Sequence, residues 1–168
     1  PSSSSGNLNQ DQGDRDEWEG ISIDCRKCSD SGIEGSARAF LEINPLGLTI
    51  CSNRVLSQED VEESLRHELV HAFDYTRRRY DLTTCEGLAA SEVRAARESE
   101  CSADKGFMLP YMRERCIQTN AAIATSNIFP STGSQCVAAV LKIALADTAP
   151  FVASSSSSSS SSKCPIKL

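Results

Sequence analysis

The chain has 168 residues, a formal net charge of −6 and a sequence pI near 5.0. An acidic chain is poorly suited to phosphate neutralisation, so the charge argues against a nucleic-acid-binding protein. The longest apolar stretch, 136–146, is interrupted by Lys142 and has about half of the ~20 residues that a membrane-spanning helix needs.

Low-complexity segments lie at both ends of the chain. Residues 1–20 are rich in Ser, Asn, Gln and acidic residues, and a run of serines fills much of 154–168. Such segments bury too little apolar surface to offset the entropy lost on ordering them. We therefore predict a disordered segment 1–20, one folded domain 21–153 and a Ser-rich tail 154–168. Because the sequence begins with Pro1 and not with Met, we also expect a fragment or a processed form.

Eight cysteines are spread along the chain. This even number and high density are typical of disulfide-bonded proteins in an oxidising compartment. The alternative is a metal cluster, but only Cys25 and Cys28 have ligand spacing, and no second close pair completes four ligands. We therefore expect disulfide bonds, whose pairing the sequence alone does not determine.

The first ordered element in chain order is a predicted antiparallel hairpin. Apolar runs at 40–43 and 48–51 flank Asn-Pro-Leu-Gly at 44–47. Proline at the second and glycine at the fourth position fit a type I turn. The run 48–51 could form an edge strand that holds an extended peptide through main-chain hydrogen bonds. The alternative is an ordinary core strand.

The strongest predicted helix follows at 58–79. Ser57 is the expected N-cap, and Asp60 three residues later approximates a capping box. Apolar residues then recur at helical spacing on one side. The arginines at 77–79 would lie in the last turn, at the negative end of the helix dipole.

Three further helices are predicted after this one. The first of them starts at a candidate capping box of Thr83 and Glu86 and ends near 104–106. The other two are expected at 111–124, where Pro110 limits the start, and at 134–146.

The only two histidines of the sequence, His67 and His71, are four residues apart in the 58–79 helix, with Glu68 between them. Positions i and i+4 share one helix face, so both imidazoles can bind one zinc ion. Glu68 can then reach a water molecule and accept its proton. Apolar neighbours such as Ala72 argue against two ordinary surface histidines. We therefore predict a zinc site with Glu68 as the catalytic residue.

The third metal ligand is predicted to be Glu92. Its apolar neighbours place it at the centre of the apolar stripe of the second helix. An ionised carboxylate there is costly unless it is paired or bound to a metal. An ion pair with Arg38 or Arg66 is one alternative. Asp81, in the turn between the helices, is the alternative third ligand, and its competing role is helix capping.

Several other polar residues are weaker candidates. Asp74 could accept the free ring N–H of a ligating histidine or be an ordinary exposed acid. Arg94 and Arg97 could stabilise an oxyanion, although their positions favour solvent exposure. Tyr75 and Tyr80 are also conceivable hydrogen-bond donors.

These motifs resemble a known family, the mitochondrial inner-membrane metalloproteases that process an ATP-synthase subunit (the "ATP-twenty-three" peptidases). The resemblance covers about residues 25–124. Cys101 and Cys116 also fall where that family carries cysteines. The segments that carry the likeness are 50–53 (ICSN), 67–74 (HELVHAFD), Asp81 and 91–96 (SEVRAA). The chain departs from the family pattern at Leu82, where an aromatic residue is expected, and near Asn120, where a basic residue is expected.

The resemblance implies an α+β, zincin-like metalloprotease domain with a small antiparallel sheet, an active-site helix and a second, ligand-bearing helix. By position, His67, His71 and Glu92 would bind Zn²⁺, and Glu68 would be the catalytic acid/base.

The activity implied is that of a zinc metalloendopeptidase in the mitochondrial intermembrane space, peripheral on the inner membrane. It would mature the precursor of an ATP-synthase membrane subunit and assist ATP-synthase assembly. The alternative is a non-proteolytic assembly factor or chaperone with a structural zinc site.

Overall fold

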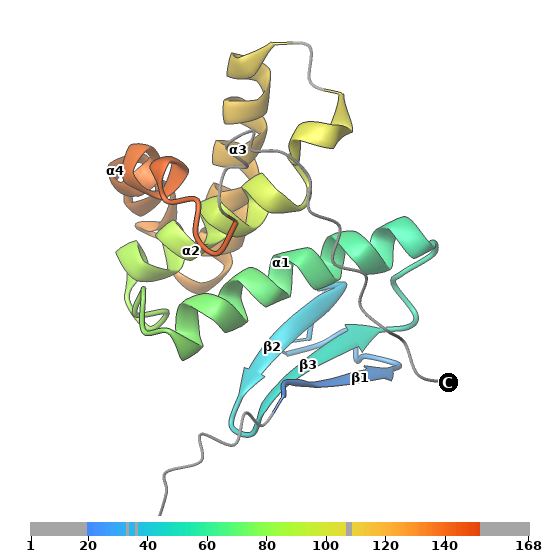
Figure 1. The fold of residues 1–168 in the computed structure, drawn as a ribbon. Helices are drawn as coiled ribbons and strands as arrows, with labels where there is room; N and C mark the ends of the chain where they lie inside the picture. The colour runs from blue at the N-terminus through green and yellow to red at the C-terminus, as the bar shows by residue number, and fades with distance from the viewer. Residues whose placement is uncertain (1–19, 33, 36, 107–108, 152–168) are drawn as a thin grey trace, which may run out of the picture.

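The computed structural model describes residues 20–32, 34–35, 37–106 and 109–151. The predicted disordered segment, apart from Gly20, and the predicted Ser-rich tail lie outside the described residues. The described part is a mixed α+β structure with one three-stranded sheet and four α-helices (Figure 1).

The sheet contains β1 (Ser22–Arg26), β2 (Ala39–Ile43) and β3 (Leu46–Cys51) in the order β1-β3-β2. β2 and β3 form the predicted antiparallel hairpin, whereas β1, which was not predicted, pairs parallel with β3. The sheet is therefore mixed and not antiparallel throughout. The proposed edge strand at 48–51 is wrong as well, because β3 is central and β2 forms the edge.

The turn of the hairpin is tighter than predicted. Only Asn44 and Pro45 separate the strands, and Gly47 already lies inside β3. A Cβ atom at Gly47 would lie 2.9 Å from Oγ of Ser22. The glycine therefore permits the close approach of β1, and the predicted four-residue type I turn is wrong.

α1 (Gln58–Thr76) begins as predicted and ends early. Oγ of Ser57 accepts a hydrogen bond from the N–H of Asp60 at 3.1 Å, and the Asp60 carboxylate accepts one from the N–H of Ser57 at 3.0 Å. This confirms the capping box. At the other end Arg78 has φ of 49°, a left-handed conformation that a helix cannot include. The predicted continuation to residue 79 is therefore wrong.

The remaining helices differ from the prediction mainly at their ends. Thr84, and not Thr83, is the N-cap of α2 (Cys85–Glu98), and its side chain accepts from the N–H of Gly87. α2 also ends before the expected 104–106. The elements that follow are the short 3-10 helix η1 (Ala103–Lys105), α3 (Pro110–Ile128), which is longer than predicted, and α4 (Gly133–Ala146).

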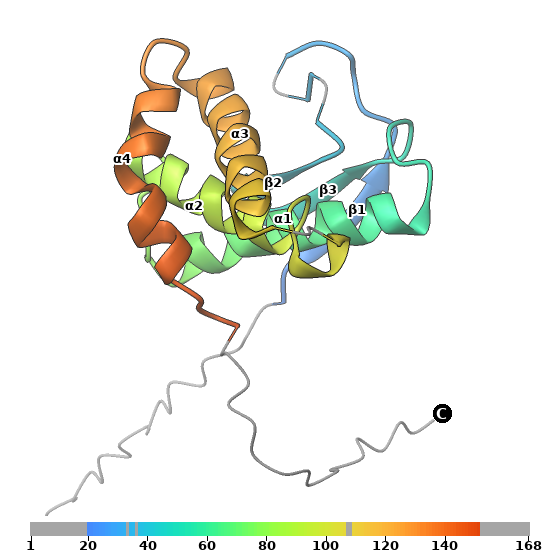
Figure 2. The ribbon, with the colours of Figure 1, turned by 90° about the horizontal axis from the view of Figure 1, so that it is seen from above.

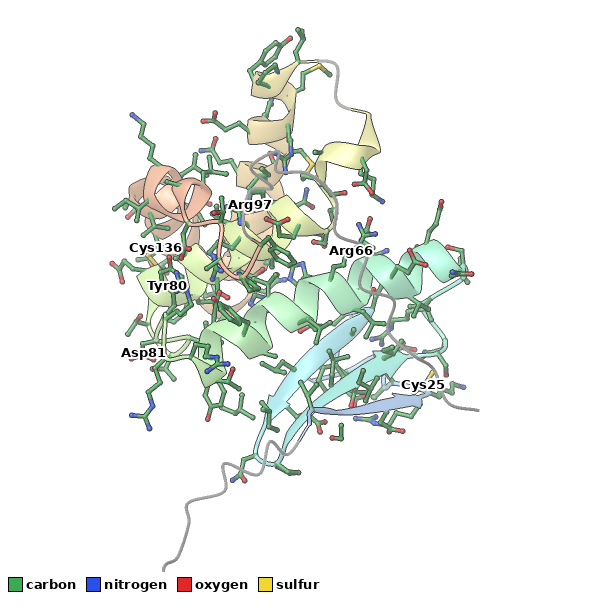
Figure 3. All side chains as sticks on the ribbon, viewed as in Figure 1. Cys25, Arg66, Tyr80, Asp81, Arg97 and Cys136 are labelled. Atoms are coloured by element: carbon green, nitrogen blue, oxygen red, sulfur yellow. A yellow bond between two sulfur atoms is a disulfide. The ribbon has the colours of Figure 1, made fainter. Side chains whose placement is uncertain are left out.

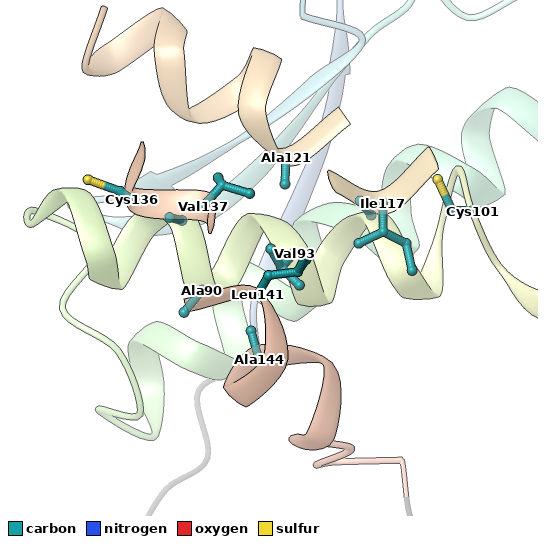
Figure 4. Close-up of a cluster of buried hydrophobic side chains, with 11 residues drawn as sticks. Ala90, Val93, Cys101, Ile117, Ala121, Cys136, Val137, Leu141 and Ala144 are labelled. Atoms are coloured by element: carbon teal, nitrogen blue, oxygen red, sulfur yellow. The ribbon is translucent and has the colours of Figure 1, made fainter. Parts of the chain in front are cut away.

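The elements form successive layers (Figures 1 and 2). α1 covers one face of the sheet, α2 packs on α1, and the antiparallel pair of α3 and α4 packs on α2. Small side chains of α2 let these helices approach closely. The larger core cluster contains Ala89, Ala90, Val93 and Ala96 from α2, Ile117 and Ala121 from α3, and Val137, Leu141 and Ala144 from α4 (Figure 4). α2 is therefore packed between the other helices. A charged side chain that α2 buries there is costly unless it has a partner.

Three disulfide bonds join described residues, which confirms that six of the cysteines are disulfide-bonded. Cys25 is an exposed free thiol, and Cys164 lies outside the described residues. The pairs are Cys28–Cys51, Cys85–Cys136 and Cys101–Cys116.

The loop between β1 and β2 is held by the residues that follow β3. The Asn53 side chain accepts from the N–H of Cys28 at 2.9 Å and donates to its carbonyl at 3.2 Å. The Arg54 guanidinium donates to the carbonyls of Ser29, Glu34 and Ala37. These contacts fix the entry to β2, the strand that borders the site described next.

Candidate metal centre

His67 and His71 on α1 face Glu92 on α2. Nε2 of His67 lies 3.3 Å from Oε2 of Glu92, and Nε2 of His71 lies 3.5 Å from Oε1. The ring centroids are 4.8 Å apart. One ligand atom from each residue lies within 4.8 Å of the others. The packing of α2 on α1 thus brings the three predicted ligands together.

The Nδ1 atoms of both rings have polar partners on the opposite side. Nδ1 of His71 is 2.7 Å from Oγ of Ser91, whose hydroxyl donates to Oδ2 of Asp74 at 2.8 Å. Nδ1 of His67 is 3.1 Å from Oε1 of Glu100. A direct hydrogen bond from the histidine ring to Asp74 had been expected. Asp74 is instead connected to His71 through Ser91. Such outer partners commonly orient metal-binding histidines.

Ser91 and Glu100 were not among the predicted site residues. The signals for Ser91 were its position directly before Glu92 and its place in the segment 91–96 that carries the family likeness. Glu100 lies beyond the end of α2, where helical periodicity no longer predicts which way a side chain faces. Burial raises the pKa of Glu100, but hydrogen bonds with His67 and Ser99 and the charge attraction to His67 together outweigh this and hold that pKa at about 2.

The two histidines differ in their electrostatics. Burial lowers the pKa of His71 to about 4, so its ring is neutral at neutral pH. Burial also disfavours charge on His67, but its hydrogen bond with Glu100 and the nearby carboxylate of Glu92 raise its pKa well above the ordinary value. Burial would raise the pKa of Glu92, and attraction to the two histidines lowers it instead. These directions favour a protonated His67 beside a neutral His71 and an ionised Glu92.

The residues present fit a metal ion. Among the described residues, Oε2 of Glu92 is one of the few buried side-chain oxygens with no hydrogen-bond partner. Oε1 of the same carboxylate faces Nε2 of the neutral His71 ring. Two imidazoles and one carboxylate are a donor set that transition metals prefer. The cluster therefore offers converging lone pairs that a cation would satisfy.

Glu68 lies beside this cluster in a cleft of about 500 Å³, lined by parts of β2, α1, α2 and the end of α3. Burial raises the pKa of Glu68 to about 7, although the N–H of Leu41 donates a hydrogen bond to it. A carboxyl group that titrates near neutral pH can both accept and return a proton. Leu82 and Leu88 also line the cleft and give it apolar walls.

Asp81, the alternative third ligand, does not belong to the cluster. It is exposed in the loop between α1 and α2 (Figure 3) and accepts hydrogen bonds from the N–H and Oγ1 of Thr83. Its carbonyl oxygen packs so closely on Gly87 that a Cβ there would come within 2.0 Å. Asp81 therefore stabilises the turn between the helices.

The other candidate residues have structural partners. Arg38 and Arg66 pair with acidic side chains other than Glu92, so the alternative ion pair to Glu92 is not formed. Arg94 and Arg97 are buried, which contradicts their expected solvent exposure.

Arg94 pairs with Asp74. Arg97, which is labelled in Figure 3, donates to the last carbonyls of α4. The Tyr80 hydroxyl donates to Asp147, and Tyr75 is exposed outside the cleft. None of these four side chains lines the cleft that holds the histidines.

The fold and the cluster together define a class: a small α+β protein with a His/His/Glu cluster between two helices that could hold a metal ion. The model of the peptidase M76 family matches residues 5–152, and the chain belongs to that family.

Relatives of known description include the Mitochondrial inner membrane protease ATP23 of Mycosarcoma maydis, 30% identical over 118 residues, which are 62% of this chain and 53% of the relative. The human Mitochondrial inner membrane protease ATP23 homolog is 28% identical over 137 residues, 76% of this chain and 54% of the relative. The homolog of Xenopus laevis is 30% identical over 139 residues, 76% of this chain and 56% of the relative. The chain thus spans about half the length of the curated relatives it matches.

No solved structure matches the chain. Within the part that the structure describes, no helix combines the length and apolar character needed to cross a membrane.

Proposed function

We propose that the chain is a zinc-dependent endopeptidase of zincin-like architecture, with residues 21–153 as its catalytic domain. His67, His71 and Glu92 are the proposed ligands of Zn²⁺, and Glu68 is the proposed catalytic residue. The observation that carries the proposal is the convergence of these three ligand atoms in the cleft that also holds Glu68. Membership of a peptidase family supports the same activity.

The chemistry follows from the side chains around the cleft. When bound, zinc supplies Lewis acidity, which makes water nucleophilic near neutral pH and polarises a peptide carbonyl. Glu68 accepts the proton of the attacking water and passes it to the leaving amine. Burial, which raises the pKa of Glu68 to about 7, suits it to both transfers.

The edge of β2 offers a binding surface for an extended peptide. The N–H of Cys51 donates to the carbonyl of Arg38, so these two residues form a hydrogen-bonded pair. In an antiparallel ladder such pairs alternate with pairs whose backbone N–H and C=O groups point away from the partner strand. In β2 the residues of this second kind are Ala39, Leu41 and Ile43, and all three line the cleft. The N–H of Leu41 already donates to Glu68. The groups of Ala39 and Ile43 can therefore pair with a substrate strand.

The proposed location is the mitochondrial intermembrane space, peripheral on the inner membrane. The relatives are named as mitochondrial inner membrane proteases, which supports a location at that membrane. Three disulfide bonds suit an oxidising compartment. The proposed substrate is the precursor of an ATP-synthase membrane subunit, with a further role in ATP-synthase assembly. Substrate and assembly role rest on the family resemblance of the motif segments.

The test compares Glu68→Gln with the wild-type chain in zinc binding and in cleavage of β-casein, an unstructured protein. The variant should keep about one zinc per chain and lose cleavage by roughly 10²- to 10⁴-fold. Glu62→Gln, an exposed glutamate of the same helix, should change neither property. Undiminished cleavage by Glu68→Gln would refute the role of Glu68. Zinc binding without any cleavage by the wild type would favour the non-proteolytic assembly factor.

A further inference from the structure

Behind His71 lies a chain of buried polar groups that does not line the cleft. Ser91, Asp74 and Arg94 are each fully buried, at 0% exposure. Oγ of Ser91 is 2.7 Å from Nδ1 of His71 and 2.8 Å from Oδ2 of Asp74, while Oδ1 of Asp74 pairs with Arg94. Arg94 also donates to the carbonyl of Ala149, beyond the end of α4. These groups connect α1, α2 and the segment after α4.

The directions of these hydrogen bonds determine where His71 carries its proton. A carboxylate paired with an arginine can only accept hydrogen bonds, so the single hydroxyl proton of Ser91 is donated to Asp74. The oxygen of Ser91 is then left as an acceptor towards His71. A short contact between two acceptors is unfavourable, so Nδ1 of His71 must carry the proton. Nε2 is left with a free lone pair, and it faces Glu92.

We propose that Ser91 is a positioning residue that holds His71 in the Nδ1-protonated tautomer, with Nε2 directed towards the metal site, and that Asp74 and Arg94 fix the direction of the Ser91 hydroxyl. The importance of this tautomer rests on the proposed metal site, because only a deprotonated Nε2 can bind a cation there. The tautomer itself does not depend on metal binding or on proteolysis. A result that refutes this tautomer and a result that refutes the proposed protease function can therefore be told apart.

His67 is held differently, which makes the proposal specific to one ligand. Its Nδ1 lies 3.1 Å from a carboxylate oxygen of Glu100, closer than the Ser99 hydroxyl at 3.4 Å. The carboxylate is an acceptor that needs no further group to set its direction. A serine hydroxyl can donate or accept, so Ser91 requires Asp74 behind it. Replacing Asp74 should therefore change the tautomer of His71 without touching the ring of His67.

The experiment uses nitrogen-detected imidazole correlations by NMR on the ¹⁵N-labelled, oxidised full chain, before and after Zn²⁺ is added. The chain has only two histidines, so each ring can be assigned. His71 of the wild type should be protonated on Nδ1 before zinc is present. Zinc affinity is measured on the same samples by competition with a chelator.

Two variants and one control are compared with the wild type. Ser91→Ala removes the acceptor, and the tautomer of His71 should become mixed. In Asp74→Asn the amide N–H₂ can donate to Ser91, which turns the hydroxyl towards His71 and moves the ring proton to Nε2. An Asp→Asn change has this effect in Ser-His-Asp triads. Both variants should bind zinc roughly 10- to 100-fold more weakly. Thr125→Val, at a buried threonine of α3 whose hydroxyl has no hydrogen-bond partner and which does not line the cleft, should behave as the wild type.

Two results would overturn the proposal. One is a wild-type His71 that carries its proton on Nε2, which needs no variant to be observed. The other is a folded Ser91→Ala protein that keeps both the Nδ1-protonated ring and wild-type zinc affinity.

Discussion

Replacing Arg94 with Met should destabilise the protein far more than an ordinary surface arginine change. The Arg94 side chain is 1% exposed and pairs with Asp74, which is fully buried. The substitution keeps much of the side-chain volume and removes the charge. It leaves the Asp74 carboxylate with the hydroxyl of Ser91 as its remaining hydrogen-bond donor among the described contacts.

The expected cost follows from this burial. Removing one partner of a buried ion pair costs about 3–5 kcal/mol, because the other charge is left uncompensated. The carbonyl of Ala149 also loses its donor, which adds to the cost. A domain of this size is stable by roughly 5–15 kcal/mol, so Arg94→Met should remove a large fraction of that stability.

Urea unfolding of the oxidised protein, followed by far-UV circular dichroism, measures this loss. The matched control is Arg66→Met, since the Arg66 side chain is 46% exposed and its acidic partners are 3.5 and 3.9 Å away. Such a surface pair contributes about 0–1 kcal/mol. In an Asp74→Asn background the cost of Arg94→Met should fall by roughly 1–3 kcal/mol. A loss for Arg94→Met no larger than that of Arg66→Met would refute the reasoning.

Two further predictions concern a disulfide bond and the pH dependence of metal binding. Replacing Cys85 and Cys136 together by Ala opens a 51-residue separation and should cost about 4 kcal/mol in the same urea assay; an unchanged midpoint would contradict this. His67, whose pKa is raised by Glu100 and Glu92 against the effect of burial, must release its proton before it binds a metal. Zinc affinity should therefore rise with pH, by up to about tenfold per unit below the pKa of His67. Chelator competition from about pH 6 to about pH 8 measures this, and a flat profile would count against the ligand role of His67.

Local patterns predicted the elements that depend on near neighbours in the chain. The Ser57–Asp60 capping box and the β2–β3 hairpin need only short-range contacts. The spacing of His67, Glu68 and His71 on one helix likewise depends on helix geometry alone. These features could therefore be predicted from the sequence.

Features that depend on tertiary packing could not be predicted in this way. Ile21, Ile23 and Cys25 alternate with polar residues around β1, but the strand is short and its side chains are mostly exposed, so its pairing with β3 is what defines it as a strand. The left-handed conformation of Arg78 ends α1 early within a run of three arginines, which by propensity alone would continue the helix.

The same limit applies to the buried charges. Arg94 and Arg97 were predicted to be solvent-exposed. α3 and α4 pack around α2, and both arginines are buried. Their acceptors come from α1 and from the end of α4, which are distant in sequence. The contact of His67 with Glu100 has the same origin, because it joins α1 to the residues that follow α2.

The central claim is that His67, His71 and Glu92 form one metal site, and zinc content tests it most directly. The oxidised full chain and two variants, Glu92→Ala and Glu86→Ala, are equilibrated with zinc, and bound metal is measured per chain. Glu86 is an exposed residue in the first turn of the same helix. We predict about one zinc for the wild type and for Glu86→Ala, and lost or much weaker binding for Glu92→Ala. Full zinc binding by Glu92→Ala, or none by the folded wild type, would contradict the claim.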